Sequence, residues 1–585
     1  MVLKFKKKNI SNYNDFYKCV NSTFNFLKNN IDHKELFLKS IKISDTKNFR
    51  LVPIGNLHLN DSAIIKKMSM WRNKNSHTFL PSKKTNFNNT KKWLKTNVYK
   101  KNDKILFLVV KDGFNPIGHI GFANCFNKKQ NFEIDNVLKG ENDSDKKIFS
   151  KALNTIITWA NNTFYINNII LKVLNNNNHA ISFYKKNNFI NYEYKENKDP
   201  KNFLTMIYKS NKKIKNLILT AGPSISQKEI VYVNDAVTNG WNNKASNYIN
   251  KLEKSFAKYL GCKYAISTSS CTGAMQIALM SLGINKGDEV IVPNVTWVAT
   301  AKAITYVGAK PVFVDINIDD WTINPYSIEK FISKKTKAIM PVHLYGQPSK
   351  MDKIMNIAKK YRLHVVEDAA PAIGAEFKNK KCGTFGDFGA FSFQGAKLLV
   401  SGEGGMLVTN NYKLYKKALK ISDHGRNEKK KFVIDSDGVK FKISNIQAAL
   451  ALAQLERINE LISLKRRIFK WYEEELKDLK NIKLNQENFN TKSIYWMTSI
   501  ILGKKVKMSR DLFCKKLFLN KVDTRPVFPE LSSFKIWGQI KKKKFKNSKF
   551  ISERAINLPS GVCLSKNEVI FVCNQIKKIL NESSY

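Results

Sequence analysis

The chain lacks the patterns typical of a disulfide framework, a zinc site or a membrane span. Its eight cysteines are scattered over 585 residues and none forms a Cys-x-x-Cys pair, which argues against a zinc site and against disulfides. The first residues lack the apolar core of a signal peptide, and no run approaches the roughly 20 apolar residues that cross a bilayer. We therefore expect a reduced, cytoplasmic protein without a membrane partner.

Acidic residues are scarce relative to basic ones. The chain has 100 Lys and Arg against 47 Asp and Glu, which gives a formal net charge of +53. Such an excess usually indicates nucleic acid or an anionic surface as a partner. Here the excess is almost entirely lysine, is spread along the whole chain and accompanies abundant Asn and Ile. This is typical of a global compositional bias, so we expect no nucleic-acid partner. The charge still favours an anionic substrate such as a sugar nucleotide.

One lysine lies in an unusual environment. The apolar run 388–393 is followed by Lys397 in a segment crowded with glycine. A lysine among aromatic and small residues loses hydration, so its pKa falls and its amine can attack a carbonyl to form a Schiff base. In a chain this rich in lysine, a surface lysine beside a hairpin is the alternative interpretation.

A second stretch supplies a partner for that lysine. The apolar run that begins at His364 ends in Glu367 and Asp368, followed by two alanines. Ligands of open α/β sheets bind beyond the carboxyl ends of the strands, where Asp368 would lie. A Schiff-base lysine with an aspartate for a pyridinium nitrogen is the arrangement that uses pyridoxal 5'-phosphate (PLP). We therefore predict a PLP site with Lys397 as the catalytic residue and Asp368 as a cofactor-binding residue. Two ordinary strand ends are the alternative.

Several further motifs follow in a fixed order along the chain. They lie at 269–274, 293–297, 311–315, 341–346, 367–370, 392–397, 402–405 and 444–449. With them, residues from about 217 to 585 resemble the DegT/DnrJ/EryC1/StrS sugar aminotransferases, which are PLP enzymes of the aspartate aminotransferase fold. The resemblance implies a nucleotide-linked keto sugar as substrate and an amino acid, typically glutamate, as amino donor.

The resemblance assigns cofactor-binding roles to further residues. Thr272 and Gly273 at a helix start, together with Ser392, would hold the PLP phosphate, because small residues and N–H groups at a helix N-terminus suit an anion. Trp297 would stack on the pyridine ring. Asn445 would reach the phosphate from the neighbouring subunit, which implies a homodimer with shared active sites. A plain helix cap and a core tryptophan are the structural alternatives.

The first third of the chain has a different pattern. Residues 1–47 predict one or two short helices without visible chemistry. From 48 onward, the order of strands and helices resembles the GNAT N-acetyltransferases, a resemblance carried by Trp93, the strand 117–122 and the segment 177–189. It implies that Asn177 contacts acetyl-CoA and that Tyr184 protonates the leaving thiolate. Core packing is the alternative for Tyr184.

The GNAT resemblance departs from its family at one loop. GNAT enzymes cradle the CoA pyrophosphate with glycine-rich backbone at a helix start. Residues 138–147 contain a single glycine and three acidic residues, which an anion would avoid. The N-terminal region is therefore expected either to acylate the amine made by the C-terminal region or to be an inactive binding or scaffolding module. Acetylation of a protein is a third alternative.

Strands alternating with helices from about 219 predict a mainly parallel, doubly wound sheet. We expect an α/β protein with a GNAT-like mixed α/β domain, then a large domain of PLP fold type I and a small C-terminal α/β domain. A continuous helix from 445 to about 475 and a strand at 495–501 are expected in the last part. The expected domains are a helical extension at 1–47, a GNAT-like domain at 48–212, a linker at 213–218, a PLP-binding domain at 219–455 and a bridging helix with the small domain at 456–585.

The expected function is that of an aminotransferase that makes an amino sugar on a nucleotide for surface polysaccharide such as O-antigen, with a fused N-acetyltransferase. A PLP sugar dehydratase is the alternative within the same family. Its members replace the Schiff-base lysine with histidine, so Lys397 argues against it. Lys440, Lys442 and Pro371 differ from residues common in the family near the substrate. The sequence therefore assigns no particular sugar.

Overall fold

The computed structural model describes residues 3–582 except for 47, 79–82, 112–114, 144, 165, 167, 193–201, 210–215, 428, 431 and 538–544. The chain divides into two compact units, Met1–Lys213 with Ile225–Val231, and Ile214–Ser224 with Tyr232–Tyr585. Positions 213–215 of the expected linker lie outside the described residues. Across the described part of the chain, no helix combines the length and apolar character needed to cross a membrane.

The first unit is built on an eight-stranded sheet in the order β1-β2-β3-β4-β5-β6-β8-β7. Only β5 and β6 run parallel, and their paired register ends where Ile134 faces Leu171. Because β5 continues beyond this point by five residues and β6 by three, the two strands separate at their carboxyl ends. The strands are β1 (Ile41–Lys42), β2 (Phe49–Pro53), β3 (Ile105–Lys111), β4 (Asn115–Ala123), β5 (Asn131–Lys139), β6 (Asn168–Leu174), β7 (Phe189–Asn191) and β8 (Phe203–Tyr208).

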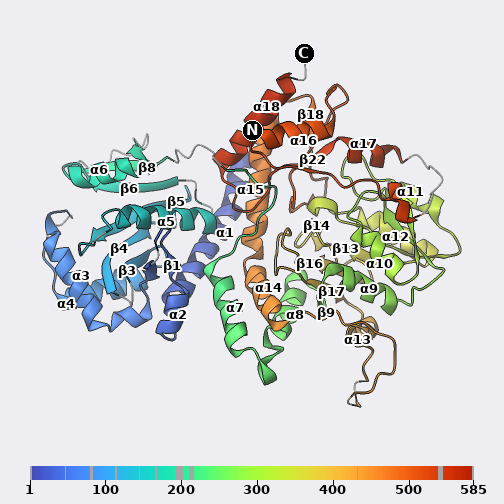
Figure 1. Ribbon diagram of the computed structural model, residues 1–585, viewed down its shortest axis with the longest axis horizontal. Coiled ribbons are helices and arrows are strands. Elements are labelled where there is room, and N and C mark those ends of the chain that lie inside the picture. Colours follow the sequence, from blue (N-terminus) through green and yellow to red (C-terminus); the bar gives the residue numbers. More distant parts are fainter. Residues whose placement is uncertain are drawn as a thin grey trace. The chain divides into compact units, whose positions relative to one another are not determined.

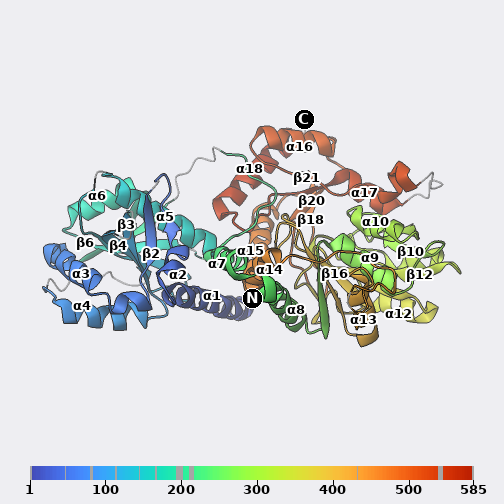
Figure 2. The same cartoon turned by 60° about the horizontal axis from the view of Figure 1, so that its bottom comes forward.

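Successive side chains of β3 point to opposite faces of this sheet, as in any strand, and pack into a separate core on each face. Phe107 packs with α1 (Leu3–Lys28) and α5 (Ile148–Thr163), whereas Leu106 and Leu108 pack on the opposite face. That second core contains α3 (Ser62–Lys74), and α4 (Phe87–Trp93) adds a partly buried tryptophan. Figure 2 shows the sheet between α3 and α4 on one side and α5 on the other.

The expectation of short helices at the N-terminus was wrong. α1 spans 26 residues and is followed by the short α2 (His33–Leu38). Phe16, Val20, Phe24 and Leu27 recur at helical spacing and are fully buried in the core of the first unit. This apolar stripe explains the long helix, and the many Lys and Asn residues between its positions obscured it.

The second unit contains a seven-stranded sheet in the order β11-β10-β12-β13-β16-β17-β9 (Figure 1). All neighbouring pairs are parallel except those of β17, which runs antiparallel to β16 and to β9. The predicted mainly parallel α/β sheet is thus confirmed. The strands are β9 (Tyr264–Thr268), β10 (Glu289–Pro293), β11 (Lys310–Val314), β12 (Thr336–Ile339), β13 (His364–Asp368), β16 (Phe388–Ser392) and β17 (Gly405–Thr409).

Helices cover both faces of this sheet. One core joins the sheet to α9 (Cys271–Ser281), α10 (Ala299–Tyr306) and α13 (Tyr412–Ile421). The core on the other face contains α12 (Met351–Tyr361). The sheet is therefore doubly wound, and the carboxyl ends of its parallel strands meet at one edge, where ligands bind in such folds.

The last part of the chain differs from expectation in two places. The expected continuous helix is divided into α14 (Asn445–Glu456) and α15 (Ile458–Leu476), because the backbone of Arg457 leaves the helical region. The expected strand 495–501 is shortened to β20 (Ser499–Leu502). Tyr495 has a positive φ of 47°, which an extended strand does not accommodate.

Candidate active site

Lys397 lies in a tight loop between β16 and β17, two fully buried strands. Its backbone N–H donates to the carbonyl of Gln394 at 2.8 Å, and the N–H of Gly395 donates to Gly402 at 2.9 Å, so the loop is closed by its own hydrogen bonds. The side chain is half-buried, and burial lowers the pKa of its amine, partly opposed by the negative charge of Asp368. A larger fraction of the amine is therefore unprotonated and nucleophilic at neutral pH.

Asp368 ends β13, the strand next to β16. The two strands are parallel, and Asp368 stands opposite Ala390 in their register. The carboxylate is 5% exposed, and burial raises its pKa. Thr300 Oγ1 donates to Oδ2 at 2.7 Å and the N–H of Ala370 donates to Oδ1 at 3.1 Å. These bonds stabilise the ionised carboxylate and so oppose the effect of burial on its pKa. The structure brings this hydrogen-bonded carboxylate and the reactive amine of Lys397 to one edge of the sheet.

The start of α9 lies beside the end of β16. The Ser270 hydroxyl caps the helix by accepting the N–H of Gly273 at 3.0 Å, so this N–H is already bound. A Cβ on Gly273 would lie 2.9 Å from the Phe441 ring, so glycine here lets that ring pack against the helix start. Ser392 is buried at the end of β16 and pairs with Gly405. A Cβ on Gly405 would lie 2.7 Å from the backbone N of Cys271, so only glycine lets β17 approach the helix start this closely.

The donor set at this edge fits pyridoxal phosphate. One amine is available for the aldehyde and one carboxylate for the ring nitrogen. The hydroxyls of Thr272 and Ser392 and the N-terminal end of α9 form the kind of site that binds a phosphate. The individual roles of these residues stay predictions.

A row of aromatic side chains leads to Lys397. Trp297, the residue expected to stack on the cofactor, is 59% exposed, and its ring centroid lies 5.7 Å from that of Phe528. Phe528 stacks on Tyr345 at 5.5 Å, and Tyr345 stacks on Trp496 at 5.8 Å. The Trp496 ring centroid lies 3.8 Å from Nζ of Lys397. Trp496 and Phe528 were not predicted from the sequence.

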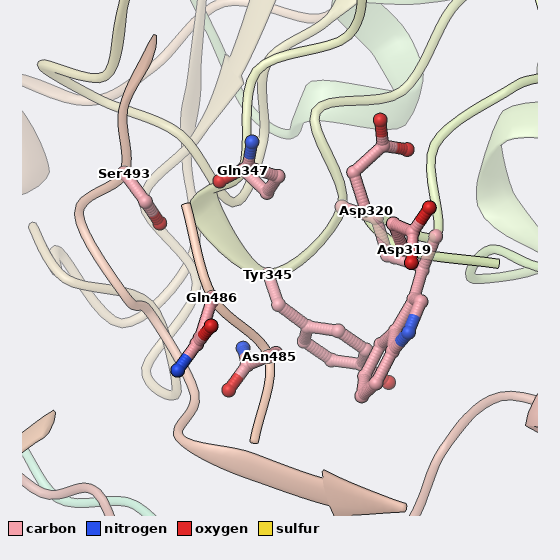
Figure 3. A pocket seen from close by; sticks show the side chains of 9 residues that line it. Asp319, Asp320, Tyr345, Gln347, Asn485, Gln486 and Ser493 are labelled. Carbon is pink, nitrogen blue, oxygen red and sulfur yellow. The ribbon is translucent and has the colours of Figure 1, made fainter. Parts of the chain in front are cut away.

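A small hollow lined mainly by polar side chains lies beside this row. Figure 3 shows Tyr345 between Asn485 and Gln486 on one side and Asp319 and Asp320 on the other. Gln347 lines the same pocket and is 6% exposed, and its Oε1 has no hydrogen-bond partner among the described residues. A buried acceptor of this kind suits a ligand hydroxyl or amine. The remaining lining residues are Trp321, Leu344 and Ser493.

A buried hydrogen-bond network orders the loop that leads into β16. His343 Nδ1 accepts the N–H of Ser349 at 3.0 Å, so its Nε2 carries the proton that bonds to Glu367 at 3.0 Å. Glu367 also accepts the N–H groups of Gly383, Phe385 and Gly386. Glu367, the neighbour of Asp368, therefore fixes the backbone that leads into β16, the strand that precedes Lys397.

Asn445, the residue expected to reach a neighbouring subunit, is bound within its own chain. It is the first residue of α14 and is 9% exposed. Its Oδ1 accepts the N–H of Tyr248 at 2.9 Å, and its Nδ2 donates to the carbonyl of Gly240 at 3.3 Å. The role across an interface stays a prediction.

The first unit places its two predicted site residues on one helix. α6 (Asn178–Lys186) begins after Asn177, whose Oδ1 accepts the N–H three residues on at 3.0 Å, so Asn177 is a helix cap. Tyr184 packs against Phe183 and Phe189, and burial raises the pKa of its phenol. The phenol is therefore protonated at neutral pH, and burial makes it a weaker acid. The acetyl-CoA roles of both residues stay predictions.

Carboxylates occupy the loop before α5, where the GNAT family cradles a pyrophosphate. Asp143 Oδ1 accepts the N–H of Asp145 at 3.0 Å, and Asp145 Oδ1 accepts the N–H of Lys147 at 2.9 Å. Their second oxygens form ion pairs with Lys111 and Lys151 at 2.8 and 2.7 Å. Two N–H groups of this loop, those of Asp145 and Lys147, are therefore bound to acidic side chains of the chain itself.

Comparison with known families matches each unit to one of them. The DegT/DnrJ/EryC1/StrS aminotransferase family matches residues 223–577, and the acetyltransferase (GNAT) family matches residues 69–189. The chain is 39% identical over 360 residues to the GDP-perosamine synthase of Escherichia coli O157:H7, a match that covers 62% of this chain and 98% of the relative. The GDP-perosamine synthase of Vibrio cholerae is 37% identical over 61% of this chain and 98% of its own.

Solved structures support the same fold. Spr1654 of Streptococcus pneumoniae, solved in PLP and pyridoxamine phosphate (PMP) forms, is 25% identical with a TM-score of 0.60, covering 63% of this chain and 98% of its own in the PMP form. An aminotransferase from Psychrobacter cryohalolentis is 25% identical with a TM-score of 0.59, over 63% of this chain and 100% of its own.

Proposed function

The chain belongs to the DegT/DnrJ/EryC1/StrS aminotransferase family, and on this premise we propose that it transfers an amino group from glutamate to the ketone of a nucleotide-linked sugar. Glutamate becomes its 2-oxo acid, and the keto sugar becomes an amino sugar. The observation that carries the proposal is the pair of Lys397 and Asp368 at the carboxyl ends of neighbouring parallel strands. Relatives named GDP-perosamine synthase favour a GDP-linked sugar as the first substrate to test.

Each residue of the proposed site has one task. Bound PLP supplies a ring that withdraws electrons from the reacting carbon. With the cofactor bound, Lys397 would hold its aldehyde, and the amine of Lys397, when free, would serve as the base and acid for the proton that transamination moves. Asp368 keeps the proton on the ring nitrogen, and Trp297 covers the ring face and excludes water. Thr272 and Ser392 bind the phosphate at the start of α9.

The polar pocket beside Tyr345 is the proposed place for polar groups of the substrate. Its free acceptor on Gln347 and its acidic side chains suit hydroxyl and N–H donors, which sugars and nucleobases both carry. We further propose a homodimer with shared sites in the cytoplasm, and a product used for surface polysaccharide such as O-antigen.

Product analysis tests the proposal. Purified protein with PLP and glutamate is offered GDP-, UDP- and dTDP-linked keto sugars, and the products are identified by mass spectrometry. We expect an amino sugar from at least one of them, and the Lys397→Ala variant should form none. A dehydrated sugar without nitrogen would favour the dehydratase alternative, and amine formation by Lys397→Ala would contradict the assignment of the catalytic residue.

Two functions are proposed for the first unit, and one observation favours each. The end of the β5–β6 pairing at Ile134 and Leu171 favours acyl transfer to the new amine, because an extended thioester arm can insert between strands that no longer bond to each other. The carboxylates of Asp143 and Asp145 favour an inactive binding or scaffolding unit, because they take the N–H groups that a pyrophosphate would need.

Titration of the full chain with acetyl-CoA separates these two functions. Saturable binding together with an acetylated amino sugar would establish the transferase. If the unchanged protein does not bind acetyl-CoA but a double variant with Asp143→Ala and Asp145→Ala does, the first unit is inactive because its own carboxylates occupy the site. Acetylation of an offered peptide but not of the amino sugar would favour a protein substrate.

A further inference from the structure

Trp496 contacts the Lys397 region at two points. The centroid of its ring lies 3.8 Å from Nζ of Lys397, and its Nε1–H donates to the carbonyl of Ala396, the preceding residue, at 2.8 Å. The indole is 6% exposed. One side chain therefore holds both the amine and the backbone from which the amine extends.

The backbone of Trp496 is fixed from both sides. Its N–H donates to the carbonyl of Tyr345 at 2.9 Å, and its carbonyl accepts Nζ of Lys465 at 2.8 Å. Lys465 is 4% exposed, and its amine also bonds to the carbonyl of Ser560. A buried lysine bonded to two carbonyls makes this anchor rigid, since leaving either carbonyl unpaired in the interior would be unfavourable.

The residue that accepts the Trp496 N–H has a strained backbone. Tyr345 has φ 52° and ψ 21°, a left-handed conformation that bulky residues rarely adopt. Its ring stacks on Trp496 with an interplanar angle of 23°. Strain of this kind persists only where the surroundings impose it, and it concentrates at functional sites.

From these contacts we infer that Trp496 is a positioning residue, which restrains the free ε-amine of Lys397 and the loop that carries it, so that the amine would stay within the site. The inference rests on the proposed function of Lys397. A released lysine has four rotatable bonds and would otherwise sample positions away from the site. The negative face of the indole attracts the ammonium form of Lys397. The hydrogen bond to the carbonyl of Ala396 fixes the position of the loop relative to the indole ring.

Formation of the Schiff base between the cofactor-free protein and PLP tests the inference. The reaction joins the amine to the aldehyde with loss of water, and its rate is followed by absorbance as a function of pH. Trp496→Leu removes the ring face and the N–H, whereas Trp496→Phe keeps an aromatic face. The matched control is Trp471→Leu, because Trp471 also carries a cation over its ring, Arg467 at 4.9 Å, but packs in the core of the small domain.

We expect Trp496→Leu to slow Schiff-base formation at least about tenfold. The pH midpoint of the reaction should fall by about half a unit to one unit, since leucine keeps the amine away from water but offers no negative face. Trp496→Phe should restore the midpoint and remain about threefold slow for lack of the N–H. The KM for the keto sugar should stay unchanged in all three variants.

Equal behaviour of Trp496→Leu and Trp471→Leu in rate and midpoint would overturn the inference and leave Trp496 as packing. If Trp496→Leu does not fold, Trp496→Phe decides, because a rate equal to that of the unchanged protein would equally overturn it. Failure of the unchanged protein to form any Schiff base would instead refute the proposed function itself.

Discussion

The Asp368→Asn variant separates the role of this carboxylate in cofactor binding from its role in folding. The substitution keeps the shape of the side chain and removes its charge. Because burial raises the pKa of Asp368, the ionised group disfavours folding at neutral pH. The amide of asparagine, however, offers only one oxygen to the two donors, Thr300 and Ala370. These effects oppose each other, so without cofactor we expect the free energy of unfolding to change by less than about 1 kcal/mol.

The effect on cofactor binding should be much larger. Removing one partner of a buried charge pair costs about 3–5 kcal/mol, which is roughly 150- to 5000-fold in a dissociation constant. PLP at about 100 times its Kd stabilises a protein by about 2.7 kcal/mol. After a weakening of about 150-fold the same concentration stabilises it by about 0.3 kcal/mol. The rise in Tm caused by PLP should therefore almost vanish.

Thermal unfolding with and without PLP measures both effects in one experiment. Asp387→Asn is the matched control, since Asp387 lies on the same pair of strands but at their amino ends, where it accepts the N–H of Val365 and pairs with His364. The control should keep the full rise in Tm on PLP addition. A full PLP-dependent rise in Asp368→Asn would refute the placement of this carboxylate at the ring nitrogen.

Three further changes follow from named contacts. Thr300→Val removes a hydrogen bond to the ionised form of Asp368, so the acidic limb of the pH–rate profile should move to higher pH by about one unit. Thr300→Ser, which keeps the hydroxyl, is the control. An unmoved limb in Thr300→Val would show that this hydrogen bond does not stabilise the ionised carboxylate. Burial lowers the pKa of His119 to about 4 from 6.5. Between these pH values the unfolded chain therefore binds more protons than the folded chain. The free energy of unfolding of the first unit should thus fall by about 3 kcal/mol as the pH drops from 6.5 to 4. In thermal scans His119→Asn should flatten this loss, and an unchanged slope would point to other groups. Asn177→Ala should lower the stability of the first unit by about 1 kcal/mol and Asn177→Ser should preserve it; equal Tm values for all three would mean that the cap does not stabilise the helix.

The sequence was sufficient to predict the sheet and to place Lys397 and Asp368 near one edge of it, because both signals are local, while the roles of the two residues stay predictions. An apolar run ending in a carboxylate is enough to place Asp368 at a strand end, and the fold rule brings strand ends to one edge. The family resemblance then supplied the order of the motifs, and the match over residues 223–577 confirmed it.

The residues that support the pair could not be predicted because their contacts are long-range. Thr300 is 68 positions from Asp368, and Trp496 is 100 positions from Ala396, whose carbonyl it binds. Trp496 also lies in an apolar run that was interpreted as a strand, and the positive φ of Tyr495 that breaks this strand leaves no mark in composition. The helix cap at the start of α9, by contrast, follows from a local rule and was open as an alternative, whereas the cap formed by Asn177 was not anticipated.

The identity of the lysine that binds the cofactor tests the central claim most directly. The protein is incubated with PLP, the Schiff base is reduced with borohydride, and tryptic peptides are analysed by mass spectrometry. The account predicts a single stoichiometric pyridoxyl adduct on Lys397, with the other lysines of this basic chain unmodified. A stoichiometric adduct on any other lysine, or none at all, would contradict it.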